Sequence, residues 1–116
     1  MNILTFDQVW NLLHSLQGTT VYTPVQHIPN KILRFTDSEM VRISGRANVK
    51  GNATAVPKSA FRSLWDTLSS RQEVTIKDVN NAWRIAAGCI LAVPELGVIE
   101  VPNSKPMAII RKNYSK

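Results

Sequence analysis

The spacing of apolar residues changes midway along this chain, and that change constrains the fold more than any other feature of the sequence. Between residues 19 and 44 apolar and polar residues alternate in short runs, which is typical of β-strands. From residue 56 onward apolar residues recur at helical spacing. Because 116 residues are near the usual size of one domain, we expect a single compact α+β domain spanning residues 1–116.

The N-terminal half, residues 1–55, is predicted to form one helix, a small antiparallel sheet of three strands and a basic loop. Thr5 and Gln8 have the spacing of a capping box, and apolar residues at helical spacing follow, which predicts a helix over about residues 5–17. Three segments rich in β-branched and aromatic residues are predicted to be strands: 19–25, 31–36 and 40–44.

Alternation within these strands predicts which side chains share a face. In the second strand, Ile32 is expected to face away from Leu33 and Phe35. In the third, Arg42 is expected to face away from Val41 and Ile43. The segment that follows, residues 45–55, has two glycines, two asparagines and few apolar residues, so it is predicted to be a loop.

The second half, residues 56–112, is predicted to contain three helices and a β-hairpin. Pro57 suits the first turn of a helix over residues 58–69, and a polar connection follows at 69–73. Thr75 and Asp78 have the spacing of a second capping box, which predicts a short second helix. The third helix is expected over residues 82–93, and the hairpin strands over 97–101 and 107–111.

This order of elements, together with the stretch LWDTLSSRQEVTIKDVNNAWRIAAGCILAVPELGVIEV, resembles the winged helix-turn-helix superfamily of DNA-binding proteins. The link between the second and third helices, Asn80 and Asn81, is shorter than in that family. The resemblance implies that the start and outer face of the third helix contact the major groove, whereas the hairpin contacts a phosphate or the minor groove. The contacts it implies are Asn80, Asn81 and Arg84 from the third helix, Asn103, Ser104 and Lys105 from the wing, and Lys77 near the DNA backbone.

Positive charge is concentrated in two parts of the chain, which has a net charge of +6. Residues 42–62 and the last sixteen residues each contain several bases and no acid. Such blocks are typical of a surface that binds a polyanion, although small proteins also carry net charge for solubility alone. The bases that we add to the predicted nucleic-acid-binding residues are Arg42, Arg46, Lys50, Lys58, Arg62 and Arg111.

Several of these residues have a simpler structural explanation. Asn80 and Asn81 are also typical helix caps, and Arg84 has Asp78 and Glu95 within reach as ion-pair partners. The tryptophans fall on the apolar stripes, so we expect them in the core rather than on a surface that stacks bases. They are Trp10, Trp65 and Trp83.

The sequence shows no pattern that predicts catalysis, a metal site or a cofactor. One cysteine and two distant histidines do not make a metal site, and no glycine-rich phosphate loop occurs. Cys89 lies in an apolar run and is predicted to be a buried thiol in a reducing, cytoplasmic compartment. Neither a secretory signal nor a membrane span is expected.

Two hypotheses about function follow from the sequence. The first is a non-catalytic protein that reads or tracks double-stranded DNA, as a homodimer or as a detached recognition domain, in a regulatory, phage or defence context. The second is a small adaptor or inhibitor whose basic face docks on an acidic protein partner, because winged-helix folds also serve as docking modules.

Overall fold

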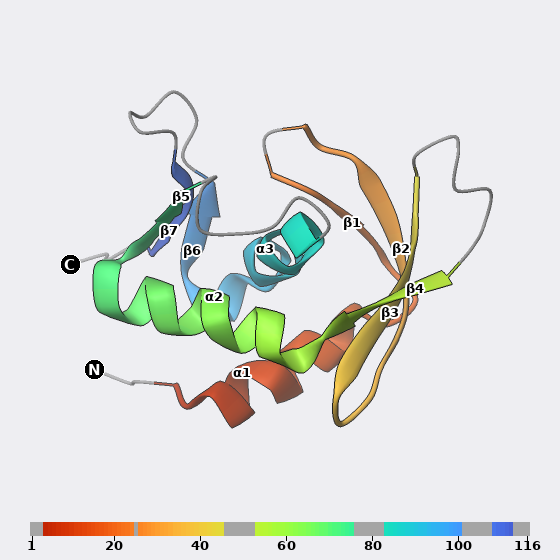
Figure 1. Cartoon of the computed structure of the whole chain (residues 1–116), viewed down its shortest axis with the longest axis horizontal. Coiled ribbons are helices and arrows are strands. Elements are labelled where there is room, and N and C mark those ends of the chain that lie inside the picture. The colour runs from red at the N-terminus through yellow and green to blue at the C-terminus, as the bar shows by residue number, and fades with distance from the viewer. Residues whose placement is uncertain (1–3, 25, 46–52, 76–82, 101–107, 113–116) are drawn as a thin grey trace.

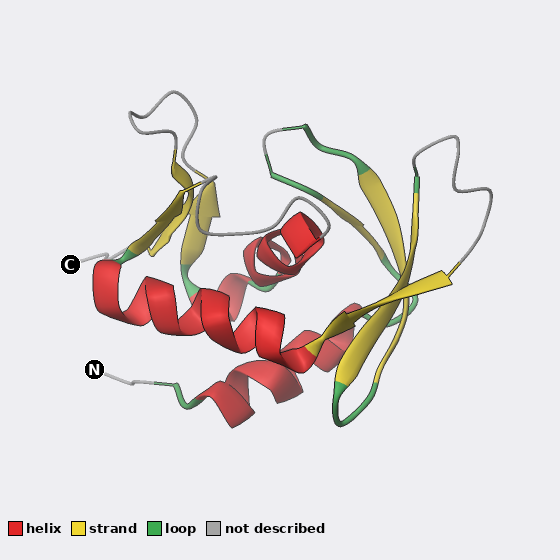
Figure 2. Cartoon of the chain, viewed as in Figure 1, coloured by secondary structure: helices red, strands yellow, loops and turns green. Residues whose placement is uncertain are grey.

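The computed structural model describes residues 4–24, 26–45, 53–75 and 83–100, and the backbone of residues 108–112. It confirms the α+β class: two antiparallel sheets lie on opposite sides of a central helix, and two further helices run across one side of the molecule (Figure 1). Figure 2 shows the same arrangement by element type. No helix in the part that the structure describes is long and apolar enough to cross a membrane.

The first helix forms where the capping box predicts it. In α1 (Phe6–Leu13), the Gln8 backbone N–H donates to Thr5 Oγ1 at 3.2 Å, and Gln8 Oε1 accepts from the Thr5 N–H at 2.9 Å. A 3-10 turn, η1 (His14–Leu16), continues the helix, and Gly18 follows with a φ of 84°. The predicted helix over residues 5–17 is therefore confirmed, with its last turn tightened.

The first sheet has four strands in the order β1-β2-β3-β4, where three were predicted. The predicted strands correspond to β1 (Thr20–Tyr22), β2 (Pro29–Phe35) and β3 (Glu39–Ser44). The fourth, β4 (Ala53–Pro57), pairs along β3, so the prediction of a loop over residues 45–55 is wrong for its last three residues. Ala53, Thr54 and Ala55 are exposed, so this part of the strand is held by pairing with β3, while Val56 is buried in the core.

A register shift in β2 changes which side chains face the core. The shift lies between Ile32 and Arg34, and it places Ile32 and Phe35 on the same buried face, although alternation predicts opposite faces. In β3 the predicted alternation is confirmed: Arg42 lies opposite Ile32 in the register, and Val41 lies opposite Arg34. Arg42 therefore belongs to the inner face of the sheet, which faces α3.

The second half of the chain adds α2 (Lys58–Arg71), α3 (Arg84–Ala92) and a second sheet. This sheet has the order β5-β7-β6, formed by β5 (Glu73–Thr75), β6 (Val98–Glu100) and β7 (Ala108–Lys112). A 3-10 turn, η3 (Pro94–Leu96), connects α3 to β6. The hairpin strands match their predicted positions closely, whereas β5 occupies part of the predicted connection and includes Thr75, which was expected to cap a helix.

One buried cluster draws residues from both halves of the chain, and α3 lies inside it. All six residues from Ile85 to Ile90 are buried, and α3 contacts α2, β1 and β6. Gly88 allows the close approach to β1, because a Cβ atom there would collide with the carbonyl oxygen of Tyr22. The third helix is thus enclosed by a helix on one side and by a strand of each sheet on the others (Figure 1).

Candidate nucleic-acid interface

The third helix has no exposed outer face for the major groove. A recognition helix needs one side free of protein, and in α3 the consecutive buried residues leave none along its middle. Arg84, at its start, is half-buried, and its buried Nε has no hydrogen-bond partner among the described residues. The middle of α3 contacts β1, α2 and β6, so any contact of this helix with DNA is left to its first residue, Arg84, and to the residues before it.

Arg42 is a second predicted contact that the structure places inside. Its Nη1 donates to Oδ1 of the buried Asn30 at 2.9 Å, so it ties β3 to β2 on the inner face of the sheet. Burial lowers the pKa of Arg42, and the nearby Cys89 acts in the opposite direction. Because this guanidinium is half-buried and bonded to protein, it is not the exposed phosphate contact that the sequence predicts.

Lys58 and Arg62, one turn apart on α2, form a surface that we call the α2 cation pair. Lys58 Nζ lies 5.9 Å from the centre of the Phe6 ring and 5.5 Å from that of Trp10, while the Arg62 guanidinium carbon lies 5.1 Å from the Phe6 centre. Both predicted bases therefore pack over the aromatic residues of α1. Within the described residues neither forms an ion pair, even with Asp7 beside Phe6 on α1.

Two exposed bases outside the predicted set lie on β2. Lys31 and Arg34 are both exposed, and in the register they lie opposite Ile43 and Val41, on the face of the sheet that turns away from α3. Tyr22 on β1 is 56% exposed and belongs to the same outer face. These two residues lie outside the acid-free stretches of the sequence, so the charge pattern did not single them out. Strand alternation, however, places Lys31 on the other face of β2 from its neighbour Ile32, which is buried.

The other predicted contacts are not placed by the structure at the level of side chains. Arg111 belongs to β7, where its backbone lies opposite Glu73 of β5 and Ile99 of β6. The remaining residues lie outside the described parts of the chain: Arg46, Lys50, Lys77, Asn80, Asn81, Asn103, Ser104 and Lys105.

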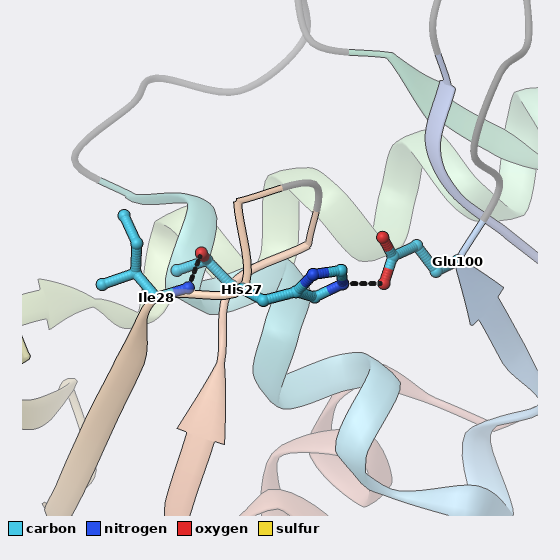
Figure 3. Close-up of polar contacts among 4 residues, drawn as sticks. His27, Ile28 and Glu100 are labelled. Carbon is cyan, nitrogen blue, oxygen red and sulfur yellow. Dashed lines mark hydrogen bonds and ion pairs between the residues drawn. The ribbon is translucent and has the colours of Figure 1, made fainter.

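The two sheets also meet through a polar contact at the surface (Figure 3). His27, in the loop between β1 and β2, has a positive φ of 53°, and its Nε2 lies 3.2 Å from Oε1 of Glu100 on β6. The neighbouring Ile28 N–H donates to Thr23 Oγ1 at 2.9 Å, which fixes the base of this loop. The contact joins one histidine to one carboxylate, so it does not provide the ligand cluster of a metal site.

Among the residues that the structure describes, no group of three or more His, Cys, Asp and Glu side chains is placed to hold a metal ion. Among the bases that the structure describes, Lys58 and Arg62 form one surface, the α2 cation pair, and Lys31 and Arg34 form a second on the outer face of β2, whereas the half-buried Arg84 lies apart from both at the start of α3. Comparison of the chain with known protein families, with curated proteins and with solved structures finds no match.

Proposed function

We propose that the protein is a non-catalytic DNA-binding protein that follows the phosphates of a duplex. The α2 cation pair carries the proposal. Two positive groups share the ring of Phe6, and no carboxylate within the described residues pairs with either. Like charges held together repel one another, and a phosphate binding between them relieves that repulsion and releases counterions from the DNA.

The order of elements in the second half supports a winged-helix unit within this proposal. Helices α2 and α3 precede the hairpin of β6 and β7, and β5, directly after α2, completes a small sheet by pairing with β7. The resemblance predicts α2, α3 and the hairpin, and the short second helix that it also predicts lies in residues 76–82, outside the described parts of the chain. The predicted wing residues Asn103 and Lys105 remain proposed contacts, as do Arg46, Lys50, Lys77, Asn80, Asn81 and Arg111.

Burial of α3 determines which kind of DNA binding we propose. A helix whose middle touches only protein does not present side chains to base edges, so direct reading of the major groove by α3 is not part of the proposal. Contacts to phosphates give affinity with little dependence on sequence. We therefore expect similar affinities for duplexes of unrelated sequence.

The test is the salt dependence of duplex binding, measured by fluorescence anisotropy. Replacing Arg62 by Gln should make the negative slope of log K against log salt shallower by about 0.9, the contribution of one phosphate contact. The matched control is Arg71→Gln at the other end of the same helix, which removes the same charge and should leave the slope unchanged. Equal slopes for the wild type and Arg62→Gln, or no duplex binding at low salt, would overturn the proposal.

An adaptor that docks on an acidic protein is the second candidate. Burial of α3 favours it, because a winged helix whose third helix is covered has lost its usual DNA-reading element. Exposed apolar side chains at Trp83 (38%) and Ile99 (45%) also suit a protein interface. A stoichiometric protein partner recovered from a nuclease-treated lysate, together with absent duplex binding, would support the adaptor over the DNA-binding protein.

A further inference from the structure

The outer face of the first sheet is a second cationic surface, distinct from the α2 cation pair. It carries one exposed aromatic side chain, Tyr22, and two exposed bases, Lys31 and Arg34. All three belong to β1 and β2, and the strand register places them on the face opposite to the buried Ile32 and Asn30. We call these three residues the sheet platform.

The strand register gives the spacing of the platform. Tyr22 lies opposite Pro29, and Lys31 lies opposite Thr20, so Tyr22 and Lys31 are diagonal neighbours. Diagonal neighbours on one face are about 7–8 Å apart, within reach of long side chains. Arg34 follows Lys31 by three residues, or about 10 Å along the strand. The Tyr22 ring therefore has Lys31 beside it, and Arg34 lies farther along β2.

The backbone of the platform is fixed, while its three side chains have no partner within the described residues. The backbone of Tyr22 is fixed by its close contact with Gly88 of α3 and by pairing with β2. Within the described residues its ring makes no aromatic contact and its hydroxyl no hydrogen bond. Lys31 and Arg34 likewise form no ion pair there, even though the half-buried Glu39 lies at the hairpin end of β3.

We propose that the sheet platform binds single-stranded nucleic acid. The Tyr22 ring stacks on an unpaired base, while Lys31 and Arg34 contact phosphates of the same strand. A sheet face that combines an exposed ring with cations is the arrangement by which several protein folds hold unpaired nucleotides. A duplex keeps its base faces stacked inside the helix, so it offers phosphates to the cations but no base face to the ring.

This inference goes beyond the proposed function, because it uses other residues and another form of nucleic acid. The α2 cation pair does not belong to the first sheet, and either surface can be removed without changing the other. Single-strand binding at the platform and duplex binding at α2 therefore succeed or fail separately.

Stacking by the Tyr22 ring is tested by measuring the affinity of the wild type and of Tyr22 variants for a fluorescein-labelled oligothymidine of roughly 15 nucleotides. Tyr22→Leu removes the ring but keeps an apolar side chain, and it should weaken binding about 5- to 100-fold, as for the loss of one stacked base. Tyr22→Phe keeps the ring and should bind within about twofold of the wild type. Far-UV circular dichroism of each variant confirms that the exposed substitution leaves the fold intact.

The cations are tested by the salt dependence of the same binding. The double variant Lys31→Gln, Arg34→Gln should make the negative slope of log K against log salt shallower by about 1.4, because each phosphate contact on a single strand contributes about 0.7. Arg62→Gln is the matched control, since it removes a base from the other surface and should leave this slope unchanged. Photo-crosslinking of a bromouracil-containing oligonucleotide should attach it to the peptide that contains Tyr22.

Each outcome decides one surface. If the protein binds duplex but not oligothymidine, the platform proposal is overturned and the proposed function stands. If Tyr22→Leu and Tyr22→Phe bind oligothymidine alike, the platform proposal is overturned whatever the duplex binding. If oligothymidine binding depends on Tyr22 while duplex binding is absent, the platform stands and the proposed function is wrong. Binding of an acidic protein at Tyr22, with no affinity for oligothymidine, also overturns the platform proposal.

Discussion

Arg42 and Cys89 lie close enough for the guanidinium to interact with the thiol between β3 and α3. Burial raises the pKa of the Cys89 thiol above its usual range, and the charge of Arg42 opposes that shift only in part. The thiol is therefore held in its neutral, unreactive form inside the folded protein.

This burial predicts how stability depends on pH. The unfolded thiol ionises near pH 8.5, whereas the folded thiol keeps its proton, so the unfolded state binds fewer protons above that pH. The free energy of unfolding should fall above about pH 8.5, by up to about 1.4 kcal/mol per pH unit from this group. Urea unfolding of the wild type and Cys89→Ala between pH 7 and 10 measures it. The same slope in both proteins would contradict the prediction.

Single residues differ in how well their sequence predicts their environment. Cys89 in its apolar run was correctly expected to be buried. Trp83 was expected in the core and is instead 38% exposed, because it precedes α3 rather than lying within it. For Lys58 and Arg62 the charge was recognised, but their packing on Phe6 was not predictable, since α1 is remote from α2 in sequence and meets it only in the folded chain.

Elements with a strong local signal formed where they were expected, and elements that depend on a distant partner did not. The capping box and apolar stripe of α1 are local, so sequence alone located the helix. Strands β4 and β5 lack an apolar run of their own and exist through pairing with β3 and β7. The register shift in β2 has no local signal either, and it alone turned Phe35 to the inner face.

The contact between α3 and β1 predicts a strong effect of a very small substitution. Gly88→Ala adds one methyl group against the backbone of Tyr22, and neither element can yield without separating from the other. We expect the free energy of unfolding to fall by about 1–3 kcal/mol, measured by urea unfolding followed through tryptophan fluorescence. Ala92→Ser, exposed on the same helix, is the control and should change it by less than about 0.5 kcal/mol. A neutral Gly88→Ala would show that α3 and β1 are farther apart.

At the scale of the whole molecule, a surface contact and a core contact between the described parts of the two sheets should differ greatly in importance. The pair of His27 and Glu100 is at the surface, whereas Ile90 on α3 is fully buried in the shared core. His27→Asn keeps a residue that tolerates positive φ and should cost less than about 1 kcal/mol. Ile90→Ala should cost about 2–5 kcal/mol.

Thermal unfolding of both variants, followed by circular dichroism and by tryptophan fluorescence, distinguishes the two contributions. Because one core spans both sheets, the two signals should change together in a single transition for the wild type. Separate transitions would contradict a shared core, and a larger effect of His27→Asn than of Ile90→Ala would mean that the sheets are held together at the surface.

The enclosed position of α3 also governs how the chain reaches this structure. The inner side of the N-terminal sheet is covered by a helix that is synthesised after all four of its strands, so that side stays exposed to water until α3 has been made. Contacts between segments so far apart in sequence require large loops to close, which slows folding relative to a helical bundle of equal size.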